Sequence, residues 1–203
     1  MANNFDVKGM TVVSPKGIAE WCKPFEPDTK FNASGELSTT LLLDPNKEDA
    51  QAFIAKLEDL RDRAFNELQE NLGVKGKQWS TADVVSEHYD KDGNPTGLVA
   101  IKFKLKDISK RKAEGKQSTV IVKDAALKDI SNEKFLIGNG SIIRCGGFAF
   151  PYEMASTKKV GVSIQFQKLQ IIELEEVAGG GDDFDVEGEE LTTTSNTEDD
   201  LDF

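Results

Sequence analysis

Residues 98–108 read Leu-Val-Ala-Ile-Lys-Phe-Lys-Leu-Lys-Asp-Ile, and this stretch decides the class of fold. Apolar and basic side chains alternate over its centre, which is the period of a β-strand, because successive side chains of a strand point to opposite faces. One face carries Ile101, Phe103 and Leu105, and the other carries Lys102, Lys104 and Lys106. The pattern predicts a strand with one face in a hydrophobic core and a row of three lysines on the other.

Basic residues continue beyond this strand. The segment 109–117 is rich in Lys and Arg, and we interpret it as a basic loop that leads to a partner strand at residues 119–122. Proteins hold single strands of nucleic acid partly through a cationic groove that follows the phosphates. An ordinary solvated edge, with lysines that oppose aggregation between strands, explains the pattern equally well. The candidate phosphate-binding residues are Lys102, Lys104, Lys106, Lys110, Arg111, Lys112 and Arg144.

Aromatic residues supply the second requirement for single-strand binding, because bases stack on their flat faces. In a predicted strand over residues 141–152, a period of two puts three aromatic residues on the same face as Arg144, although Gly146-Gly147 can bend the register. Aromatic stripes in strands belong more often to a core, so core packing and base stacking both stay open as interpretations. Three further aromatic residues occur in irregular segments, where a ring is harder to bury. The candidate stacking residues are Phe148, Phe150, Tyr152, Trp21, Trp79 and Tyr89.

The remaining patterns indicate a mainly β domain of the α+β class. Strands are predicted at residues 5–13, 18–25, 36–43 and 160–174, the first two joined at a bulge or kink, with Pro24 and Pro27 breaking the pattern. With the first two segments counted as one bent strand, and with the two strands above and the partner strand added, about six strands accompany one long helix. The sequence is that of an antiparallel sheet with a single helical addition.

The helix is predicted between Asp44 and Gly73. Asp44-Pro45 has the form of an N-cap followed by proline at the first helical position, and Gly73 is a natural stop. Apolar residues recur between them at helical spacing, which indicates one core-facing stripe. Residues 73–77 read Gly-Val-Lys-Gly-Lys and lack the spacing of a phosphate-binding P-loop, so we interpret them as a mobile basic loop.

Charge is distributed unevenly along the chain. The net charge is −11, but residues 175–203 contain 12 acidic residues and no Lys or Arg, which leaves 24 acids against 25 bases in the preceding part. Gly179-Gly180-Gly181 has the composition of a flexible linker, and the acidic segment after it has too few large apolar residues to fold. We therefore predict a folded domain over residues 1–176 and a disordered acidic tail over residues 177–203, which is an interaction segment or merely a solubilising one.

Several function classes have no support in the sequence. His88 is the only histidine, Cys22 and Cys145 are far apart without a CxxC pair, and no hydrolase or metalloprotease motif occurs. We predict a non-enzymatic protein with no catalytic residues, no metal and no cofactor, whose cysteines are buried, inert thiols. Neither an apolar leader nor a run of about 18 apolar residues is present, so we expect a soluble, cytoplasmic protein.

Several short motifs resemble those of the single-stranded DNA-binding proteins of tailed phages. They are Ser-Pro-Lys-Gly-Ile-Ala at 14–19, Pro-Asp-Thr-Lys-Phe-Asn at 27–32, Asp-Gly-Asn-Pro-Thr-Gly at 92–97, Gly-Asn-Gly-Ser at 138–141 and Gly-Val-Ser at 161–163. The chain departs from the family pattern at Trp21-Cys22, where a tyrosine-proline pair is expected. The resemblance implies an OB-fold-type barrel elaborated by a helix, a role in DNA replication and recombination in an infected bacterium, and an acidic tail with a terminal aromatic residue that recruits partner enzymes.

The resulting hypothesis is sequence-tolerant binding of single-stranded DNA (ssDNA), in a groove formed by the Lys102 to Lys116 region and the Arg144 to Tyr152 strand. The tail is predicted to bind a polymerase, nuclease or helicase. Its candidate partner-binding residues are Asp199, Asp200, Asp202 and Phe203. The alternatives are a protein-interaction adaptor whose tail is the active part, and a binder that prefers RNA. Self-association is left open.

Overall fold

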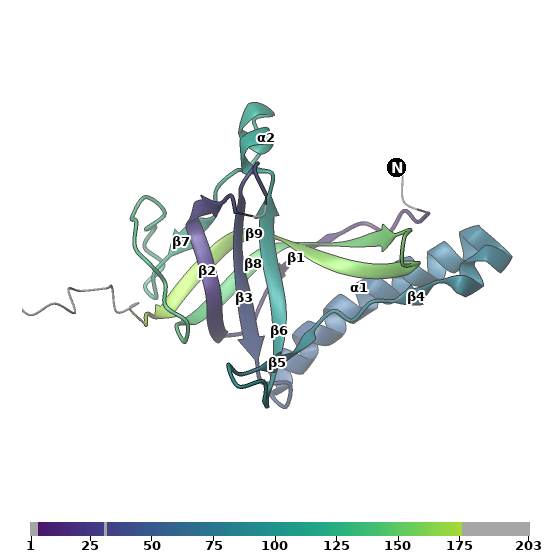
Figure 1. Cartoon of the computed structure of the whole chain (residues 1–203), viewed down its shortest axis with the longest axis horizontal. Coiled ribbons are helices and arrows are strands. Elements are labelled where there is room, and N and C mark those ends of the chain that lie inside the picture. The colour runs from purple at the N-terminus through teal and green to yellow at the C-terminus, as the bar shows by residue number, and fades with distance from the viewer. Residues whose placement is uncertain (1–3, 31, 176–203) are drawn as a thin grey trace, which may run out of the picture.

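The computed structural model describes residues 4–30 and 32–175, and it is a mainly β structure with one long helix, as predicted (Figure 1). Its strands are β1 (Met10–Val13), β2 (Gly17–Asp28), β3 (Glu36–Leu43), β4 (Ser80–Thr81), β5 (Ser86–Tyr89), β6 (Pro95–Lys106), β7 (Ile121–Lys123), β8 (Ile142–Met154) and β9 (Lys159–Glu173). Its helices are α1 (Glu48–Leu72), the 3₁₀ helix η1 (Gly73–Gln78) and α2 (Ile108–Ala113). The predicted tail, with Asp199, Asp200, Asp202 and Phe203, lies outside the described residues.

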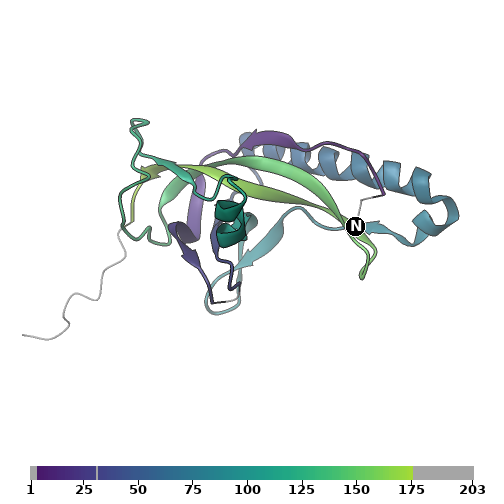
Figure 2. The ribbon, with the colours of Figure 1, turned by 90° about the horizontal axis from the view of Figure 1, so that it is seen from above.

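Five of the strands close a barrel. β2 pairs with β3, β3 with β6, β6 with β9, β9 with β8, and β8 again with β2, so the hydrogen-bonded neighbours form a ring. All of these pairs are antiparallel except β6 with β9. This is the OB-fold architecture that the resemblance to phage proteins implied. Beyond the barrel, β8 and β9 continue as a long hairpin that runs beside α1 (Figures 1 and 2).

Alternate residues of these strands fill the barrel. Ile101, Phe103 and Leu105 of β6 are buried, as the alternation predicted, and the rings of Phe103 and Phe166 meet edge to face with centroids 6.1 Å apart. The helix α1 adds the predicted apolar stripe, whose buried members are Ala50, Phe53, Leu57, Leu60, Ala64 and Leu68. Burial of apolar side chains from both the barrel strands and α1 holds the helix against the barrel.

The helix begins later than the sequence indicated. Lys47, not Asp44, is its N-cap, and Lys47 makes no side-chain capping bond. Asp44 instead holds a turn, because its carboxylate accepts the N–H of Asn46 at 2.9 Å and its carbonyl oxygen accepts the N–H of Lys47 at 3.1 Å. An Asp that bonds its own following backbone favours a turn over a helix start. Gly73 ends α1 as predicted, with a φ of 55°.

β2 is longer than predicted, because it continues through Pro24 and Pro27 to Asp28. Proline lacks the N–H that a strand donates to its neighbour, and it is therefore confined to free edges. β8 pairs with β2 only at Gly17 and Ile18, so the later part of β2 has a strand partner on one side alone, which is β3. Pro24 and Pro27 also fall between Lys23 and Asp28, where the register with β3 is interrupted, so neither has to donate an N–H to a neighbouring strand.

Four further assignments differ from the prediction. The segment predicted as a mobile basic loop at residues 73–77 is part of η1, and the basic segment after β6 begins with the short helix α2. β7 pairs in parallel with β9, and not with the strand of residues 98–108. β4 and β5 arise from the stretch 74–89, in which the sequence showed no clear pattern, so the described residues hold nine strands and not about six.

The two cysteines are buried and not bonded to each other, as predicted. Burial raises the pKa of the Cys22 thiol to about 11, against a smaller lowering by a hydrogen bond with Thr39. Burial also raises the pKa of Cys145. Because the thiolate is the reactive form, neither side chain is a nucleophile at neutral pH.

Two kinds of feature are absent from the described part of the chain. No helix within residues 4–30 and 32–175 is both long and apolar enough to cross a membrane. The same residues contain no cluster of three or more His, Cys, Asp or Glu side chains suited to a metal ion.

Candidate nucleic-acid interface

The three lysines of β6 lie on the outer surface of the barrel. The strand register lines each of them up with a polar residue of β3, the pairs being Lys102 with Thr40, Lys104 with Ser38 and Lys106 with Glu36. Those β3 residues pair in turn with Glu20, Lys23 and Asp28 of β2. Directly opposed residues have Cβ atoms about 4.5–5.5 Å apart. The outer surface of β2, β3 and β6 is therefore a continuous polar face with the lysine row along β6.

One carboxylate partly balances this row. Glu36 lies 3.5 Å from the Nζ atom of Lys104 and 4.0 Å from that of Lys106, whereas Lys102 forms no ion pair with the described part of the chain. Ion pairs between solvent-exposed groups contribute about 0–1 kcal/mol, so a phosphate can replace Glu36 as a partner at little cost. The row remains cationic because two lysines share one acid and the third has none.

The hairpin of β8 and β9 presents two aromatic residues beside this row. Along β8 the odd-numbered residues Cys145 and Ala149 are buried, while Phe150 is 37% exposed and Tyr152 is half-buried. The predicted irregularity at Gly146-Gly147 occurs, but the extra residue belongs to β9, because Gly146 pairs with Lys168 and Gly147 with Phe166. The alternation of β8 therefore continues without interruption.

Tyr152 lies against a glycine of the opposite strand. Its cross-strand partner is Gly161, and a Cβ atom on Gly161 would stand 2.8 Å from the Tyr152 ring. Only a residue without a side chain leaves room for the ring there. Gly161 thus lets the phenol lie close to the strand, with its orientation set by the backbone beneath it.

A groove of about 790 Å³ joins these elements. It contains six of the residues predicted from sequence, which are Lys102, Lys104, Lys106, Arg111, Phe150 and Tyr152. They come from β6, α2 and the β8–β9 hairpin, which are far apart in the chain. The rest of the lining comes chiefly from residues that were not among the candidate site residues, which are Asp83, Val84, Val85, Ser86, Ser163 and Gln165. We call this cavity the β6–hairpin groove.

Arg111 is fixed at the end of the groove by hydrogen bonds to its guanidinium group. Its Nε donates to the carbonyl oxygen of Lys106 at 3.1 Å, Nη1 to that of Gln117 at 3.0 Å, and Nη2 to Oε1 of Gln165 at 2.9 Å. These bonds tie α2 to the junction of β6 and β9. Arg111 therefore has a structural role as well as a charge at the groove.

The other predicted phosphate-binding residues do not line the groove. Lys110 and Lys112 belong to α2, and Lys110 lies 4.0 Å from Glu114. Arg144 is on the barrel part of β8, opposite Gln170. None of the three is brought together with the aromatic pair.

Four of the predicted stacking residues also lie elsewhere, and one of them, Trp21, is on β2. One side of the Phe148 ring lies against the segment before β1, because a Cβ atom on Gly9 would be 2.5 Å from it. Trp79 is half-buried against the cluster of Phe5, Ala64, Leu68 and Val160. Tyr89 is exposed on β5 and donates a 2.5 Å hydrogen bond to Glu87, which raises the pKa of the phenol.

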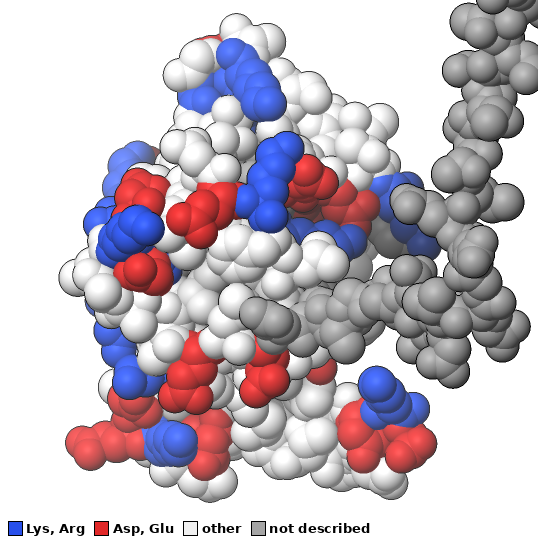
Figure 3. All heavy atoms as spheres, turned by 90° about the vertical axis from the view of Figure 1, so that its left-hand side faces the viewer, with Lys and Arg blue, Asp and Glu red and all other residues white. Residues whose placement is uncertain are grey.

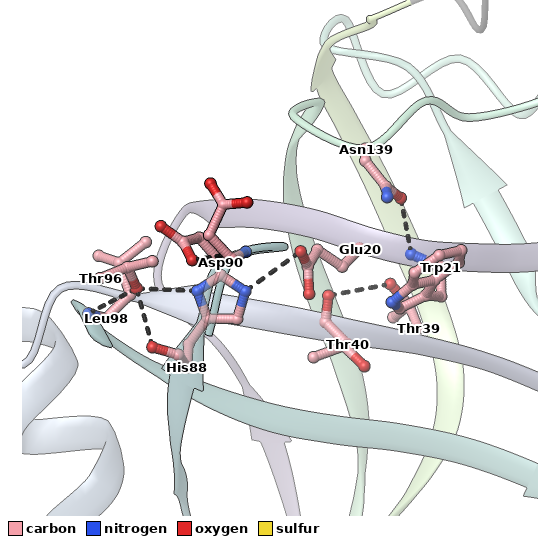
Figure 4. Close-up of polar contacts among 10 residues, drawn as sticks. Glu20, Trp21, Thr39, Thr40, His88, Asp90, Thr96, Leu98 and Asn139 are labelled. Atoms are coloured by element: carbon pink, nitrogen blue, oxygen red, sulfur yellow. Dashed lines mark hydrogen bonds and ion pairs between the residues drawn. The ribbon is translucent and has the colours of Figure 1, made fainter. Parts of the chain in front are cut away.

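A separate polar contact attaches β5 to β2 near the lysine face. The His88 ring lies 2.8 Å from the Thr96 hydroxyl through Nδ1 and 3.2 Å from the Glu20 carboxylate through Nε2 (Figure 4). Both ring nitrogens are therefore engaged by groups of the protein. The contact holds the β5–β6 hairpin over β2, and the histidine has a structural role.

The surface around β2 differs from the lysine row, because Figure 3, which views the molecule from the left-hand side of Figure 1, shows basic and acidic side chains interleaved. Lys23 pairs with Asp28 at 2.6 Å, and Lys134 pairs with Glu26 at 3.3 Å. A surface on which the cations are matched by acids attracts a polyanion less than a row with excess positive charge. This contrast favours the β6–hairpin groove as the candidate site.

Solved structures similar to this chain include single-stranded DNA-binding proteins of bacteriophages. The crystal structure of gp2.5, encoded by bacteriophage T7, matches with a TM-score of 0.64 and 18% sequence identity, covering 91% of this chain and 100% of that one. The protein from bacteriophage Enc34 in complex with ssDNA has a TM-score of 0.49 and 11% identity, covering 86% and 95% of the two chains. The first match shows a shared fold. Neither a protein-family model nor a curated protein sequence matches the chain.

Proposed function

We propose that this protein binds single-stranded DNA with little sequence preference, and that the β6–hairpin groove is the binding site. The observation that carries the proposal is the meeting of the lysine row with Phe150 and Tyr152 in one groove. Lys102, Lys104 and Lys106 contact the phosphates, and the two rings stack on bases. A basic track beside aromatic faces is the usual arrangement for single-strand binding.

The chemistry of the groove favours unpaired bases over a duplex. In a duplex the flat faces of the bases are stacked on each other, so Phe150 and Tyr152 have no surface to contact. Stacking also accepts any base, because every base has a π-face. Gln165 is the one side-chain amide among the lining residues, and its oxygen accepts a hydrogen bond from Arg111.

Fluorescence anisotropy with labelled oligonucleotides tests this function. We expect the full-length protein to bind oligothymidylate and mixed-sequence ssDNA with similar affinity, and a duplex of the same length more weakly. Competition by an RNA of matched sequence measures the preference between the two nucleic acids, because neither stacking nor phosphate contact reads the 2′-hydroxyl. Absence of binding to either single strand would leave the adaptor function as the better account.

The acidic tail adds a second part to the proposal, which is that the protein protects ssDNA and recruits replication or recombination enzymes to it. Residues 175–203 carry 12 acids and no base and finish in Asp-Asp-Leu-Asp-Phe. Asp199, Asp200 and Asp202 complement a basic patch on a polymerase, nuclease or helicase, and Phe203 supplies an apolar anchor. The charge pattern of the sequence supports this part of the proposal.

The tail is also expected to compete with DNA for the lysine row. A tethered polyanion raises the local concentration of negative charge at a basic groove and lowers the apparent affinity for DNA. Deleting residues 179–203 should therefore tighten ssDNA binding, most strongly at low salt, where Coulomb interactions are least screened. Replacing Phe203 alone by alanine is the matched control, since it should spare DNA affinity and weaken the partner. Equal affinities of the full-length and truncated proteins across a salt titration would rule out the competition.

A further inference from the structure

Trp21 is an extra residue inserted into β2. Between Glu20 and Lys23 the strand β2 advances by three residues, while its partner β3 advances by two, from Thr40 to Ser38. Ala19 and Cys22 are both buried, so the inward positions resume on either side of Trp21. One residue is therefore left over, which defines a β-bulge. Without the bulge, alternation would turn the indole into the core.

The backbone at this bulge adopts a conformation that favours glycine. Trp21 has a φ of 52°, in the left-handed region that side chains with a Cβ atom rarely occupy. Its indole is 68% exposed, which makes it one of the most exposed large apolar side chains among the described residues. A large aromatic group that is held in a disfavoured conformation and points to solvent is costly to keep without a use. Such outliers concentrate at binding sites.

Asn139 completes the geometry. β8 stops pairing with β2 at Ile18, and the turn after residue 137 takes its place. Ala19 donates its N–H to the carbonyl oxygen of Ser141 at 2.8 Å, and Gly140 donates its N–H to that of Ala19 at 3.0 Å. The next free donor is the N–H of Trp21, and it binds Oδ1 of Asn139 at 2.9 Å (Figure 4). The amide oxygen therefore replaces a strand carbonyl where the backbone turns away.

We propose that Trp21 is a second base-stacking platform on the ssDNA path, and that Asn139 is the residue that positions it. This inference rests on the proposed ssDNA-binding function and extends its site beyond the β6–hairpin groove. Because the indole is exposed, it lies on the outside of β2, the same outer surface that carries the lysine row. β2 and β6 are separated only by β3, which sets them about 10 Å apart at a strand spacing of about 4.8 Å. Glu20, the residue before Trp21, aligns through Thr40 with Lys102, which places Trp21 two strands away from the lysine row.

The two tryptophans of the chain allow a direct test by fluorescence. In a Trp79→Phe variant Trp21 is the only tryptophan, and oligothymidylate should quench its emission in step with the anisotropy of the oligonucleotide. The reciprocal Trp21→Phe variant retains Trp79, which packs against Leu68 and Val160, and its emission should change little. Anisotropy reports the binding itself in both variants. An absence of binding would contradict the proposed function, whereas binding without quenching of Trp21 would overturn this inference alone.

Trp21→Gly separates stacking from stability. Glycine accepts the left-handed backbone, so the variant should be at least as stable to heat as the native protein. Loss of one stacking contact should lower ssDNA affinity by about 5- to 150-fold. Asn139→Ala should weaken binding in the native background and have no further effect in the Trp21→Gly background, because Asn139 acts through Trp21. An unchanged affinity of Trp21→Gly would overturn the assignment of Trp21 as a stacking platform. Additive losses in the double variant would overturn the assignment of Asn139 as its positioning residue.

Discussion

Replacing Lys102, Lys104 and Lys106 together by glutamine should weaken ssDNA binding about 100-fold at 0.1 M salt. Each phosphate that a single strand places against a lysine contributes about −0.7 to the slope of log affinity against log salt, so three lost contacts change the slope by about 2. Relative to a common value near 1 M salt, a slope change of about 2 corresponds to two decades at 0.1 M. Titrations at several salt concentrations measure both quantities.

The matched control removes the same charge from other surfaces. Lys8, Lys128 and Lys134 are exposed lysines outside the groove, in ion pairs with Asp6, Glu133 and Glu26. Their triple glutamine variant changes the net charge equally, but it should leave the slope nearly unchanged, because distant charges act only through a screened field. If both variants weaken binding alike, the lysines act through net charge and the groove assignment is wrong.

The β6 strand and the α1 stripe could be predicted because their signals are local. In residues 101–106 every second residue is apolar, and one buried face requires that pattern wherever the partner strands lie. The apolar spacing from Ala50 to Leu68 is likewise a property of one helix. The start of that helix was missed because Asp44 serves equally well in a turn and in a cap, and only the hydrogen bonds to Asn46 and Lys47 distinguish the two.

Barrel closure and strand partners could not be predicted in this way. The parallel pairing of β7 with β9 brings Val122 opposite Leu169, and nothing in the short segment 119–122 indicates a neighbour so distant in sequence. The bulge at Trp21 is equally hidden, because neighbours in the sequence do not indicate a left-handed φ at a tryptophan. These features depend on contacts between distant segments, which periodicity does not encode.

The candidate site could be predicted only in part, because it too depends on contacts between distant segments. Lys102, Lys104 and Lys106 could be found by alternation, and Phe150 and Tyr152 share a strand face with Phe148. Phe148 does not line the groove and lies beside Gly9 instead, which is a contact between distant segments. The wall formed by Asp83 and Val84 to Ser86 carries neither a charge run nor an aromatic pattern. Along β9, Ser163 and Gln165 alternate with apolar residues, and this pattern was the one sequence signal for the part of the groove that β9 forms.

Phe150→Ala and Tyr152→Ala should each reduce ssDNA binding by about 1–3 kcal/mol, which is the contribution of one base stacked on an aromatic face, while the fold is retained. Anisotropy measures the binding loss, and thermal unfolding shows whether the protein stays folded.

The control for these changes is Phe148→Ala, because Phe148 is 36% exposed and Phe150 is 37% exposed, yet only Phe150 lines the groove. Equal exposure makes the two substitutions comparable in their cost to folding, so a difference in affinity reports position alone. Phe103→Ala gives the opposite signature, since emptying a fully buried site should cost about 3–5 kcal/mol of stability. If Phe150→Ala and Tyr152→Ala destabilise the protein as Phe103→Ala does and leave affinity intact, their rings are core packing. Stacking then belongs to Trp21 on the far side of the lysine row, and the DNA path runs across β3 without entering the hairpin.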